Sequence, residues 1–285
     1  MQAKVSVQLH LLRVGACRHL ACMAARGAGW RWVDFPALCG LIRHPQQGWL
    51  LFDTGYAEHF FTATAQWPER LYRALLPVSL PAHDSLHRQL AHHGLAPADI
   101  GHVIISHYHG DHVAGLRDFP RARFFASAAD TAHCLNLAGK RWRATLQAQL
   151  PGLLPPDFSH RWQAIENCAR RDLPGWLTPF TQGFDLLGDG SLLAVPLPGH
   201  SHGQSGLFLP DVAGRPVFLV ADACWSLPAL QADCLPSRLT GFLQAGGQDY
   251  ARTFHALHCL SRQEPALTLL PSHCPVAWEA FHAAS

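Results

Sequence analysis

One seven-residue stretch, SHYHGDH at positions 106–112, constrains this chain more than any other feature. It holds three histidines and one aspartate, and it follows the mainly apolar residues 102–105 (HVII), which predict a buried strand. A strand that ends in such a turn presents its side chains at the edge of a sheet. Imidazole and carboxylate groups are ligands for zinc and other divalent first-row metals. The stretch therefore predicts a metal site at a sheet edge in an α/β protein.

The composition is that of a globular protein with a large core. Hydrophobic residues make up 48% of the 285 residues, which fits a single domain over residues 1–285. The formal net charge is +2 without a clustered basic run, so no nucleic-acid partner is expected. No apolar run reaches the ~20 residues that a membrane span needs, so no membrane partner is expected either. We expect a monomer or homodimer that binds a small-molecule substrate.

The nine cysteines indicate the compartment. They show no CxxC spacing, and no convincing signal peptide precedes them. Reduced thiols in a cytoplasmic protein are the simplest interpretation.

Alternation and turn signals predict strands along the chain with helices between them. Strands are predicted at residues 4–14, 36–43, 48–53, 102–105, 121–126, 191–196, 205–209, 216–221 and 266–270. Helices are predicted at residues 84–93, 128–138, 248–260 and 276–284. Residues 139–185 combine many aromatics with little periodicity, and we expect a partly helical insertion there that is either extra core or a substrate cap.

Further candidates for the metal site lie at the ends of predicted strands. They are Asp53, His200, Asp222 and His273. Ligands at several strand ends converge in space although they are distant in sequence, and with the loop residues they predict two sites. The first site comprises His107, His109 and His200. The second comprises Asp111, His112 and His273, and the two oxygens of Asp222 would bridge both metals.

Two metals about 3.5–4 Å apart can activate a bridging water and polarise a substrate oxygen, so no serine or cysteine nucleophile is required. For two features near the predicted site the sequence allows two interpretations each. Asp53 either caps a turn or hydrogen-bonds a metal-ligating histidine from behind. Residues 15–35 predict a loop whose aromatics, Trp30, Trp32 and Phe35, either cap the core or form an apolar wall over the site.

The pattern His107-x-His109-x-Asp111-His112 is followed by PGH at residues 198–200, by the strand end at Asp222 and by His273. In this order the motifs resemble those of the metallo-β-lactamase superfamily, and FDTG at residues 52–55 is similar to its early motif. The resemblance implies an αββα sandwich with a dinuclear metal centre at one edge, usually occupied by zinc. The same ligand types also accept iron, manganese or cobalt.

Within the superfamily, the spacing of 22 residues from His200 to Asp222 resembles that of the N-acyl homoserine lactone lactonases. This resemblance implies that a metal-bridging hydroxide attacks an ester-like carbonyl, of a lactone or of another ester with an apolar or aromatic portion. It makes Asp111 the catalytic residue that passes a proton to the leaving oxygen. Those lactonases carry a tyrosine three residues after the bridging aspartate, where this chain has tryptophan. The predicted substrate contacts are Trp225, Trp30, Trp32 and Phe35.

Other activities use the same metal chemistry. A thioesterase similar to glyoxalase II, a phosphoesterase and a β-lactamase are the alternative enzymes, and a metal-binding sensor without turnover is an alternative of another class. Cys224 would be a ligand in a β-lactamase, but we interpret it, like Cys274, as a structural thiol. His202 is the alternative ligand to His200. Hydrolysis of lactones, thioesters and phosphoesters by metal-loaded protein would separate these activities.

Overall fold

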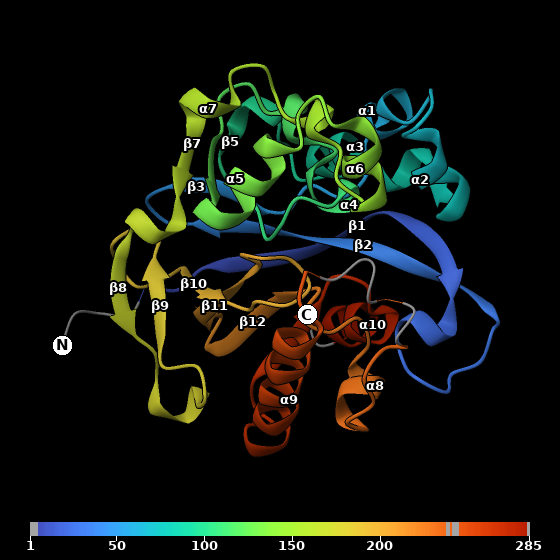
Figure 1. Cartoon of the computed structure of the whole chain (residues 1–285). Helices are drawn as coiled ribbons and strands as arrows, with labels where there is room; N and C mark the ends of the chain where they lie inside the picture. Colours follow the sequence, from blue (N-terminus) through green and yellow to red (C-terminus); the bar gives the residue numbers. More distant parts are fainter. Residues whose placement is uncertain (1–4, 238–239, 241–244, 284–285) are drawn as a thin grey trace.

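In the computed structural model, which describes residues 5–237, 240 and 245–283, the N-terminal strands form an antiparallel meander (Figure 1). The strands β1 (Gln8–Leu20), β2 (Trp32–His44) and β3 (Gly48–Phe52) pair in that order, and β2 and β3 form the predicted hairpin. The loop predicted for residues 15–35 is shorter, because a register shift between Arg13 and Ala16 lets β1 continue to pair with β2 up to Leu20.

Parallel strands complete the first sheet. They are β5 (Ile100–Ile104), β6 (Arg123–Ala126) and β7 (Trp162–Ala164), and the short β4 (Val78–Ser79) pairs with β1 at the other edge. The order across the sheet is β4-β1-β2-β3-β5-β6-β7. Each of the parallel strands needs a crossover, and these crossovers place helices on one face of the sheet.

The second sheet follows in the chain and has the order β13-β12-β11-β10-β9-β8. Its strands are β8 (Ala169–Asp172), β9 (Gln182–Asp185), β10 (Leu193–Pro196), β11 (Ser205–Val212), β12 (Arg215–Ala221) and β13 (Thr268–Pro271). Neighbours are antiparallel except for β12 and β13, which run parallel.

The helices form two outer layers, so the predicted αββα sandwich is confirmed (Figure 1). The upper layer covers the first sheet and contains α1 (Glu58–Ala63), α2 (Arg70–Leu75), α3 (Leu86–His92), α4 (Gly110–Val113), α5 (Ala128–Asn136), α6 (Arg141–Leu146) and α7 (Phe158–Arg161). The lower layer contains α8 (Leu227–Gln231), α9 (Gly247–Gln263) and α10 (Pro275–Ala283). Ala284, the last residue of the predicted final helix, lies outside the described residues.

Three apolar clusters hold these layers together. Between the sheets, Phe52 and Ile104 from the first sheet share a buried cluster with Leu207 and Leu219 from the second. The other two clusters lie between each sheet and its helices. Burial of large side chains in these clusters is the main stabilising contribution, about 1.5–3 kcal/mol for each side chain.

The predicted insertion at residues 139–185 is partly helical and also supplies strands. It contributes β7 to the edge of the first sheet and β8 and β9 to the second sheet. The segment therefore crosses between the two sheets in addition to packing over them. No helix in the described part of the chain is long and apolar enough to cross a membrane.

Four strand ends that carry candidate ligands meet at one edge of the sandwich. Phe52 pairs with Ile104, which brings the ends of β3 and β5 together, and the Asp53 N–H donates to the Ile104 carbonyl at 2.9 Å. Ala221 pairs with Pro271, which does the same for β12 and β13. A hydrogen bond of 2.9 Å from the Leu38 N–H to the Ser272 carbonyl joins the two sheets at this edge.

Candidate metal centre

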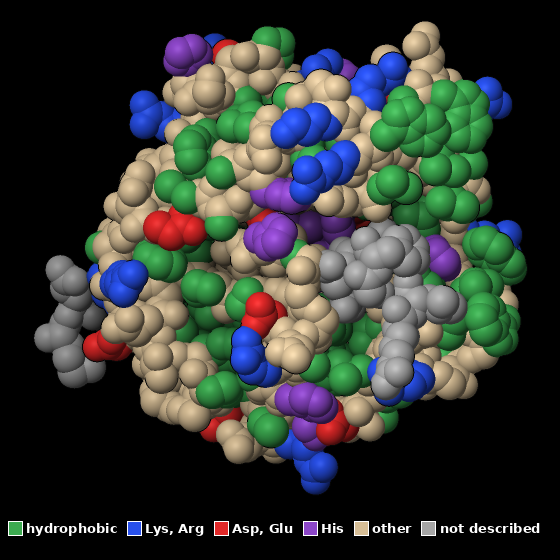
Figure 2. All heavy atoms as spheres, in the orientation of Figure 1, with side chains coloured by type: hydrophobic (Ala, Val, Ile, Leu, Met, Phe, Trp, Pro, Cys, Tyr) green, Lys and Arg blue, Asp and Glu red, His purple; other side chains and the backbone are tan. Residues whose placement is uncertain are grey.

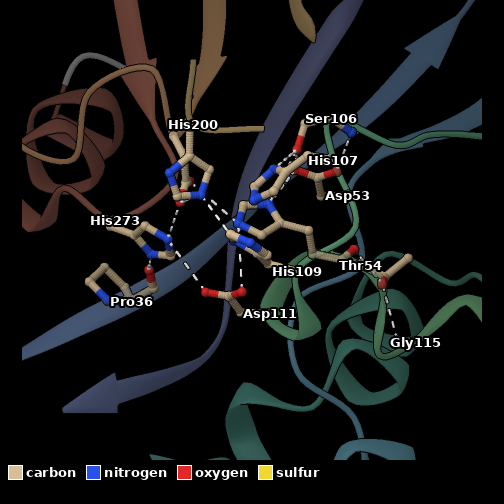
Figure 3. A network of polar contacts seen from close by, with 12 residues as sticks. Pro36, Asp53, Thr54, Ser106, His107, His109, Asp111, Gly115, His200 and His273 are labelled. Atoms are coloured by element: carbon tan, nitrogen blue, oxygen red, sulfur yellow. Dashed lines mark hydrogen bonds and ion pairs between the residues drawn. The ribbon is translucent and has the colours of Figure 1, made fainter. Parts of the chain in front are cut away.

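The histidine-rich loop leaves β5 and turns directly into the short helix α4. His107 and His109 lie in the loop, whereas Asp111 and His112 lie in α4. All four side chains are buried or nearly so. Those of His107, His109 and Asp111 lie beside His200 and His273, which follow strands of the second sheet (Figure 3). The loop predicted from the sequence thus presents its side chains to one place in the fold.

His200 joins two of these histidines in a group of imidazoles. One ring nitrogen each of His107, His109 and His200 lies within 4.8 Å of the others. His200 Nε2 is 2.9 Å from His109 Nδ1, and the ring of His107 lies 4.7 Å from that of His109 and 4.8 Å from that of His200. This first group has the composition predicted for the first metal site.

Asp111, His112 and His273 form a second group by the same distance criterion. His273 Nε2 lies 3.4 Å from Asp111 Oδ2, and His112 Nε2 lies 3.8 Å from Asp111 Oδ1. These residues come from α4 and from the end of β13, so the group spans both sheets.

Asp222 contacts both groups with its two oxygens. Its Oδ2 lies 3.2 Å from His200 Nε2 and 3.1 Å from His273 Nε2, and its Oδ1 lies 3.4 Å from His112 Nε2. A third set of possible ligands, His107, His112 and Asp222, overlaps the first two groups. This is the position that a bridging carboxylate requires.

Several polar atoms that face this cluster are buried without a hydrogen-bond partner in the described part of the chain. They are His107 Nε2, His112 Nε2 and Asp222 Oδ1. A buried polar atom without a partner costs about 1–3 kcal/mol, and such atoms call for an explanation. Metal ions would coordinate imidazole nitrogens and carboxylate oxygens of this kind, so the donor set fits two divalent cations.

Hydrogen bonds behind the ligands orient the rings. Asp53 is fully buried, and its Oδ2 accepts the Nδ1–H of His112 at 2.8 Å, which leaves Nε2 directed into the cluster. Ser106 donates its hydroxyl to the same Oδ2 at 2.7 Å and lies 3.0 Å from His107 Nδ1. The Pro36 carbonyl lies 2.8 Å from His273 Nδ1 and accepts its proton (Figure 3). Such contacts set the tautomer of a metal-ligating histidine.

The pKa values of the first group are lowered. Burial lowers the pKa of His107 and His200 well below the usual value, and neighbouring histidines contribute to the shift. Burial likewise lowers the pKa of His109, to about 4, although Asp111 and Asp222 oppose the shift. These three imidazoles are therefore neutral at pH 7, which is the form that binds metal.

In the second group the carboxylates outweigh burial. Burial opposes protonation of His112, but Asp222, Asp111 and Asp53 together raise its pKa well above the usual value. The pKa of His273 is also raised, since Asp222 and Asp111 outweigh its burial. The same histidines hold the pKa of Asp222 well below its usual range against the effect of burial. Without metal, protons on these histidines offset the negative charge that would otherwise face a cation.

The backbone at two of the strand ends is strained. Asp53 has a φ of 60° and Ala221, next to Asp222, has a φ of 48°. Non-glycine residues seldom adopt such values, and they persist where the surrounding structure enforces them, often at functional sites. Gly199, before His200, has a φ of 130°, and an added Cβ would lie 2.1 Å from the Tyr250 backbone nitrogen. Glycine is therefore required at that position.

A small pocket of about 50 Å³ opens onto the cluster. Figure 2 shows histidine side chains at a hollow between the two layers. Besides five of the ligand residues, the walls of the 50 Å³ pocket consist of Cys17, His19, Phe35, Tyr72, Leu76, Ala148 and Trp225. Larger cavities of about 290 and 510 Å³ elsewhere contain none of the seven candidate ligands.

The predicted substrate contacts fall into two sets. Trp225 and Phe35 line the pocket, and the Trp225 indole N–H donates to Asp222 Oδ2 at 3.0 Å. Trp30 and Trp32 do not line it, and their side chains are 70% and 53% exposed. Trp32 stacks on His19 at 6.1 Å instead.

The alternative ligands lie outside the three ligand groups of the described residues. Cys224 and Cys274 are buried, and the Cys274 sulfur accepts the Leu227 N–H at 3.3 Å. His202 is exposed and contacts the ring of His133 at 4.9 Å, whereas its neighbour His200 lies in the cluster.

Sequence reasoning missed four residues around the site. Ser106 and Pro36 orient ligands, Tyr72 places a phenol in the pocket wall, and Asp130 binds the segment next to His200. Ser106 stands inside the predicted loop, and its position before the first ligand was a usable signal. The other three are brought to the site by packing between distant elements and have no local signal.

Comparisons with known proteins agree with this geometry. Residues 32–234 match the metallo-beta-lactamase superfamily. The N-acyl homoserine lactonase AttM of Rhizobium radiobacter is 27% identical over 195 residues, and the match covers 66% of this chain but 63%, less than two thirds, of that relative. The protein of the same name from Rhizobium johnstonii is 25% identical over 289 residues, or 96% of each chain.

A solved structure of an N-acyl homoserine lactone hydrolase, with the product N-hexanoyl-L-homoserine at its catalytic metal centre, has the same fold. It aligns with a TM-score of 0.73 at 16% identity over 98% of this chain and 97% of that one. The superfamily match spans most of the chain, from β2 to the end of α8 and beyond. This chain therefore belongs to the metallo-beta-lactamase superfamily.

Proposed function

We propose that this chain hydrolyses lactones at a dinuclear metal centre, with N-acyl homoserine lactones as the substrate class. The observation that carries the proposal is the position of Asp222, whose two oxygens contact the first and second ligand groups at 3.1–3.4 Å. The names of its relatives and the product in the similar structure support the lactone.

In this proposal His107, His109 and His200 hold one ion, and Asp111, His112 and His273 hold the other. Asp222 would contribute an oxygen to each ion, and zinc is the expected metal because most of the donors are imidazoles. When bound, the two ions would supply a water of lowered pKa and a polarised substrate carbonyl.

The side chains around the cluster have separate tasks. Asp111 belongs to the second group and also lines the pocket, where it can take a proton and deliver it to the leaving oxygen. Trp225 donates to Asp222 Oδ2 and so holds the bridging carboxylate in one rotamer. Its N–H is therefore directed at the protein, and not at the substrate.

Trp225 stands where the lactonases carry a tyrosine, and in this chain Tyr72 provides a phenol from another part of the fold. It comes from α2, lines the pocket and is 5% exposed. Burial and the nearby Asp111 raise its pKa well above the usual value, so the hydroxyl stays protonated as a hydrogen-bond donor. We assign this donor to the oxygen of the opened lactone.

The pocket wall indicates how the substrate lies. Phe35, Leu76, Ala148 and Trp225 give it an apolar surface. The pocket, at about 50 Å³, is far smaller than the roughly 300–1,000 Å³ of sites that enclose a drug-sized ligand, so it would hold only the reacting group. The acyl chain of the substrate would therefore extend out of the pocket along the apolar wall.

The test is hydrolysis of matched substrates by zinc-loaded protein. N-hexanoyl homoserine lactone, a simple γ-lactone, a glutathione thioester, a phosphodiester and a β-lactam should be compared by kcat/KM. We expect the highest value for the acylated lactone. A higher value for the thioester, phosphodiester or β-lactam would replace the lactone in the proposal, and no turnover of any of them would favour a metal-binding sensor.

Two histidines of one loop give a matched pair of variants. His200→Ala should lose turnover and one bound ion, whereas His202→Ala, two residues further on and exposed, should keep both. Equal losses in the two variants would contradict the assignment of His200 as a ligand.

A further inference from the structure

The first turn of α5 contacts both chain segments that supply the imidazoles of the first group. Asp130 binds the His200 loop, defined as residues 197–204 between β10 and β11. The next residue, Thr131, binds Tyr108, which stands between His107 and His109. Two adjacent residues of one helix therefore contact two distant segments of the chain. The ligands on these segments, His109 and His200, are 91 residues apart in the sequence.

Asp130 holds the His200 loop through two hydrogen bonds. Its Oδ1 accepts the Gly203 N–H at 2.8 Å, and its Oδ2 accepts the hydroxyl of Ser201. The Asp130 side chain is buried, and among the described residues no lysine or arginine forms an ion pair with it. A buried carboxylate without a cationic partner is costly unless hydrogen bonds satisfy it. Both oxygens of Asp130 therefore accept hydrogen bonds from residues close to His200 in the loop.

The loop lies unusually close to the helix. A Cβ on Gly203 would lie 2.0 Å from the Ser127 hydroxyl oxygen and 3.1 Å from the Asp130 backbone nitrogen. Ser127 is the residue that caps α5, and its hydroxyl accepts the Asp130 N–H at 3.5 Å. Glycine at position 203 therefore allows a contact that any larger residue would break.

Thr131 fixes the other segment. Its hydroxyl donates to the Ser127 carbonyl at 2.7 Å, so its oxygen is left to accept the Tyr108 hydroxyl at 2.7 Å. Tyr108 and Thr131 are both 1% exposed, so water does not compete for this bond. The peptide that joins the two ligands of the histidine-rich loop is thus tied to the same helical turn.

On its other side the His200 loop contacts α9 and the residues just before it, where the Thr253 hydroxyl donates to the Pro198 carbonyl at 2.7 Å. The N–H groups of Ala245 and Gly246 donate to the carbonyls of His200 and Gly199, both at 3.1 Å. These bonds tie the loop to α9 and to the residues before it, and none of them involves α5. Substitutions in α5 therefore change one side of the loop and leave the other intact.

We propose that Asp130 and Thr131 form a clamp that positions His200 relative to His107 and His109 and so sets the metal affinity of the first group. They are positioning residues, since neither touches the metal site. The inference rests on the proposed function, because it requires that the first group binds a metal. Its physical basis is that fixed ligands lose less conformational freedom when the ion binds.

The test measures zinc binding by the metal-free protein in competition with a chelator of known affinity. Two dissociation constants are resolved, and His200→Ala and His273→Ala identify which constant belongs to which group. Asp130→Ala should weaken the constant of the first group by about 10- to 100-fold, which is the usual effect of losing a contact behind a metal ligand. The constant of the second group should change by less than about threefold.

Asp185 offers a control for the loss of a buried, hydrogen-bonded carboxylate, although it also forms an ion pair with Arg171 at 2.8 Å. It is also a buried carboxylate, and it accepts two backbone N–H groups, from Gly188 and Gly190, both at 2.9 Å. It pairs with Leu193 at the end of β10 opposite the His200 loop. Asp185→Ala should lower the melting temperature as Asp130→Ala does, and leave both zinc constants unchanged. If Asp130 contributed to stability alone, Asp130→Ala and Asp185→Ala would both lower the melting temperature and neither would change the zinc constants.

Milder variants keep the test decisive if Asp130→Ala does not fold. Ser201→Ala and Tyr108→Phe each remove one hydrogen bond and should weaken the first constant by roughly 3- to 10-fold. Asp130→Asn should restore much of the affinity, because its amide can accept from Gly203 and donate to the Ser201 oxygen. The absorption spectrum of the cobalt-loaded protein should change in the Ala variants and return in Asp130→Asn.

The outcomes separate the two claims. A wild-type protein that binds two zinc ions, together with clamp variants whose first constant is unchanged, would overturn the clamp and leave the proposed function standing. Equal weakening of both constants in the clamp variants would also overturn it. A wild-type protein that binds no zinc would overturn the proposed function and this inference with it.

Discussion

Asp53→Asn should weaken the second ligand group without disturbing the backbone. Asparagine tolerates the φ of 60° at this position better than most residues. Asp53 accepts the Ser106 N–H at 2.8 Å with Oδ1, and the Nδ1–H of His112 at 2.8 Å with Oδ2. An asparagine that keeps the first bond turns its NH2 group toward His112, where two donors would meet. His112 would then move its proton to Nε2, which faces the cluster.

The magnitude follows from the bond that is lost. A hydrogen bond to a charged group contributes about 1.5–3 kcal/mol. Losing the contact behind a metal-binding histidine lowers metal affinity by about 10- to 100-fold, or about 1.4–2.8 kcal/mol. The entropy of unfolding is about 0.6 kcal/mol per kelvin for a chain of this length, so the metal-free variant should melt about 2–5 °C below the wild type.

The assay is the same chelator competition, with thermal melting of the metal-free protein beside it. Asp189→Asn is the control, because Asp189 accepts the N–H and the hydroxyl of Ser191 at 3.0 and 2.6 Å and lies 2.8 Å from His44 Nε2. This arrangement resembles that of Asp53 but lies at the far end of β2, away from the cluster. The control should lower stability alone. If Asp53→Asn binds both ions within about threefold of the wild type, the tautomer argument is refuted.

Three further predictions concern the pocket and the pH dependence. Tyr72→Phe should lower kcat for lactones by about 10- to 100-fold with little change in KM, as measured by steady-state kinetics, if the phenol donates in the transition state. Trp225→Phe should keep the apolar wall but free Asp222, so it should weaken zinc binding by about 10-fold in the chelator assay, and unchanged binding would show that the indole only packs. The metal-free protein should be most stable near pH 6.5. Below that pH the histidines of the unfolded chain bind protons, whereas His109 in the folded protein stays neutral because its pKa is lowered to about 4. Stability therefore falls as the pH is lowered. Above it, the stability that the raised pKa of His112 contributes is lost, and melting curves of chelator-treated protein that rise steadily with pH would contradict this.

The convergence of the candidate ligands could be predicted because its signals are local. The apolar residues before Ser106 predict β5, and the ligands stand directly after it. Asp222 and His273 likewise follow apolar strands, so their convergence follows from the rule that ligands gather at strand ends. The strand pairings Phe52 with Ile104 and Ala221 with Pro271 then place all of them at one edge.

The surroundings of the cluster could not be predicted in the same way. Aromatic content alone suggested Trp30 and Trp32 as substrate contacts, but composition does not tell which side of a ribbon faces the pocket. Tyr72 reaches the pocket from α2, and Asp130 reaches the His200 loop from α5. Both contacts depend on how helices pack on the first sheet, which the periodicity of a single helix does not specify.

The claim that the cluster binds two metal ions is tested most directly by anomalous diffraction from crystals of the zinc-loaded protein, with data on both sides of the zinc absorption edge. We predict two peaks, one among His107, His109 and His200 and one among Asp111, His112 and His273. They should lie about 3.5–4 Å apart with Asp222 between them. A single peak in the cluster, or zinc bound only elsewhere on the chain, would contradict the account.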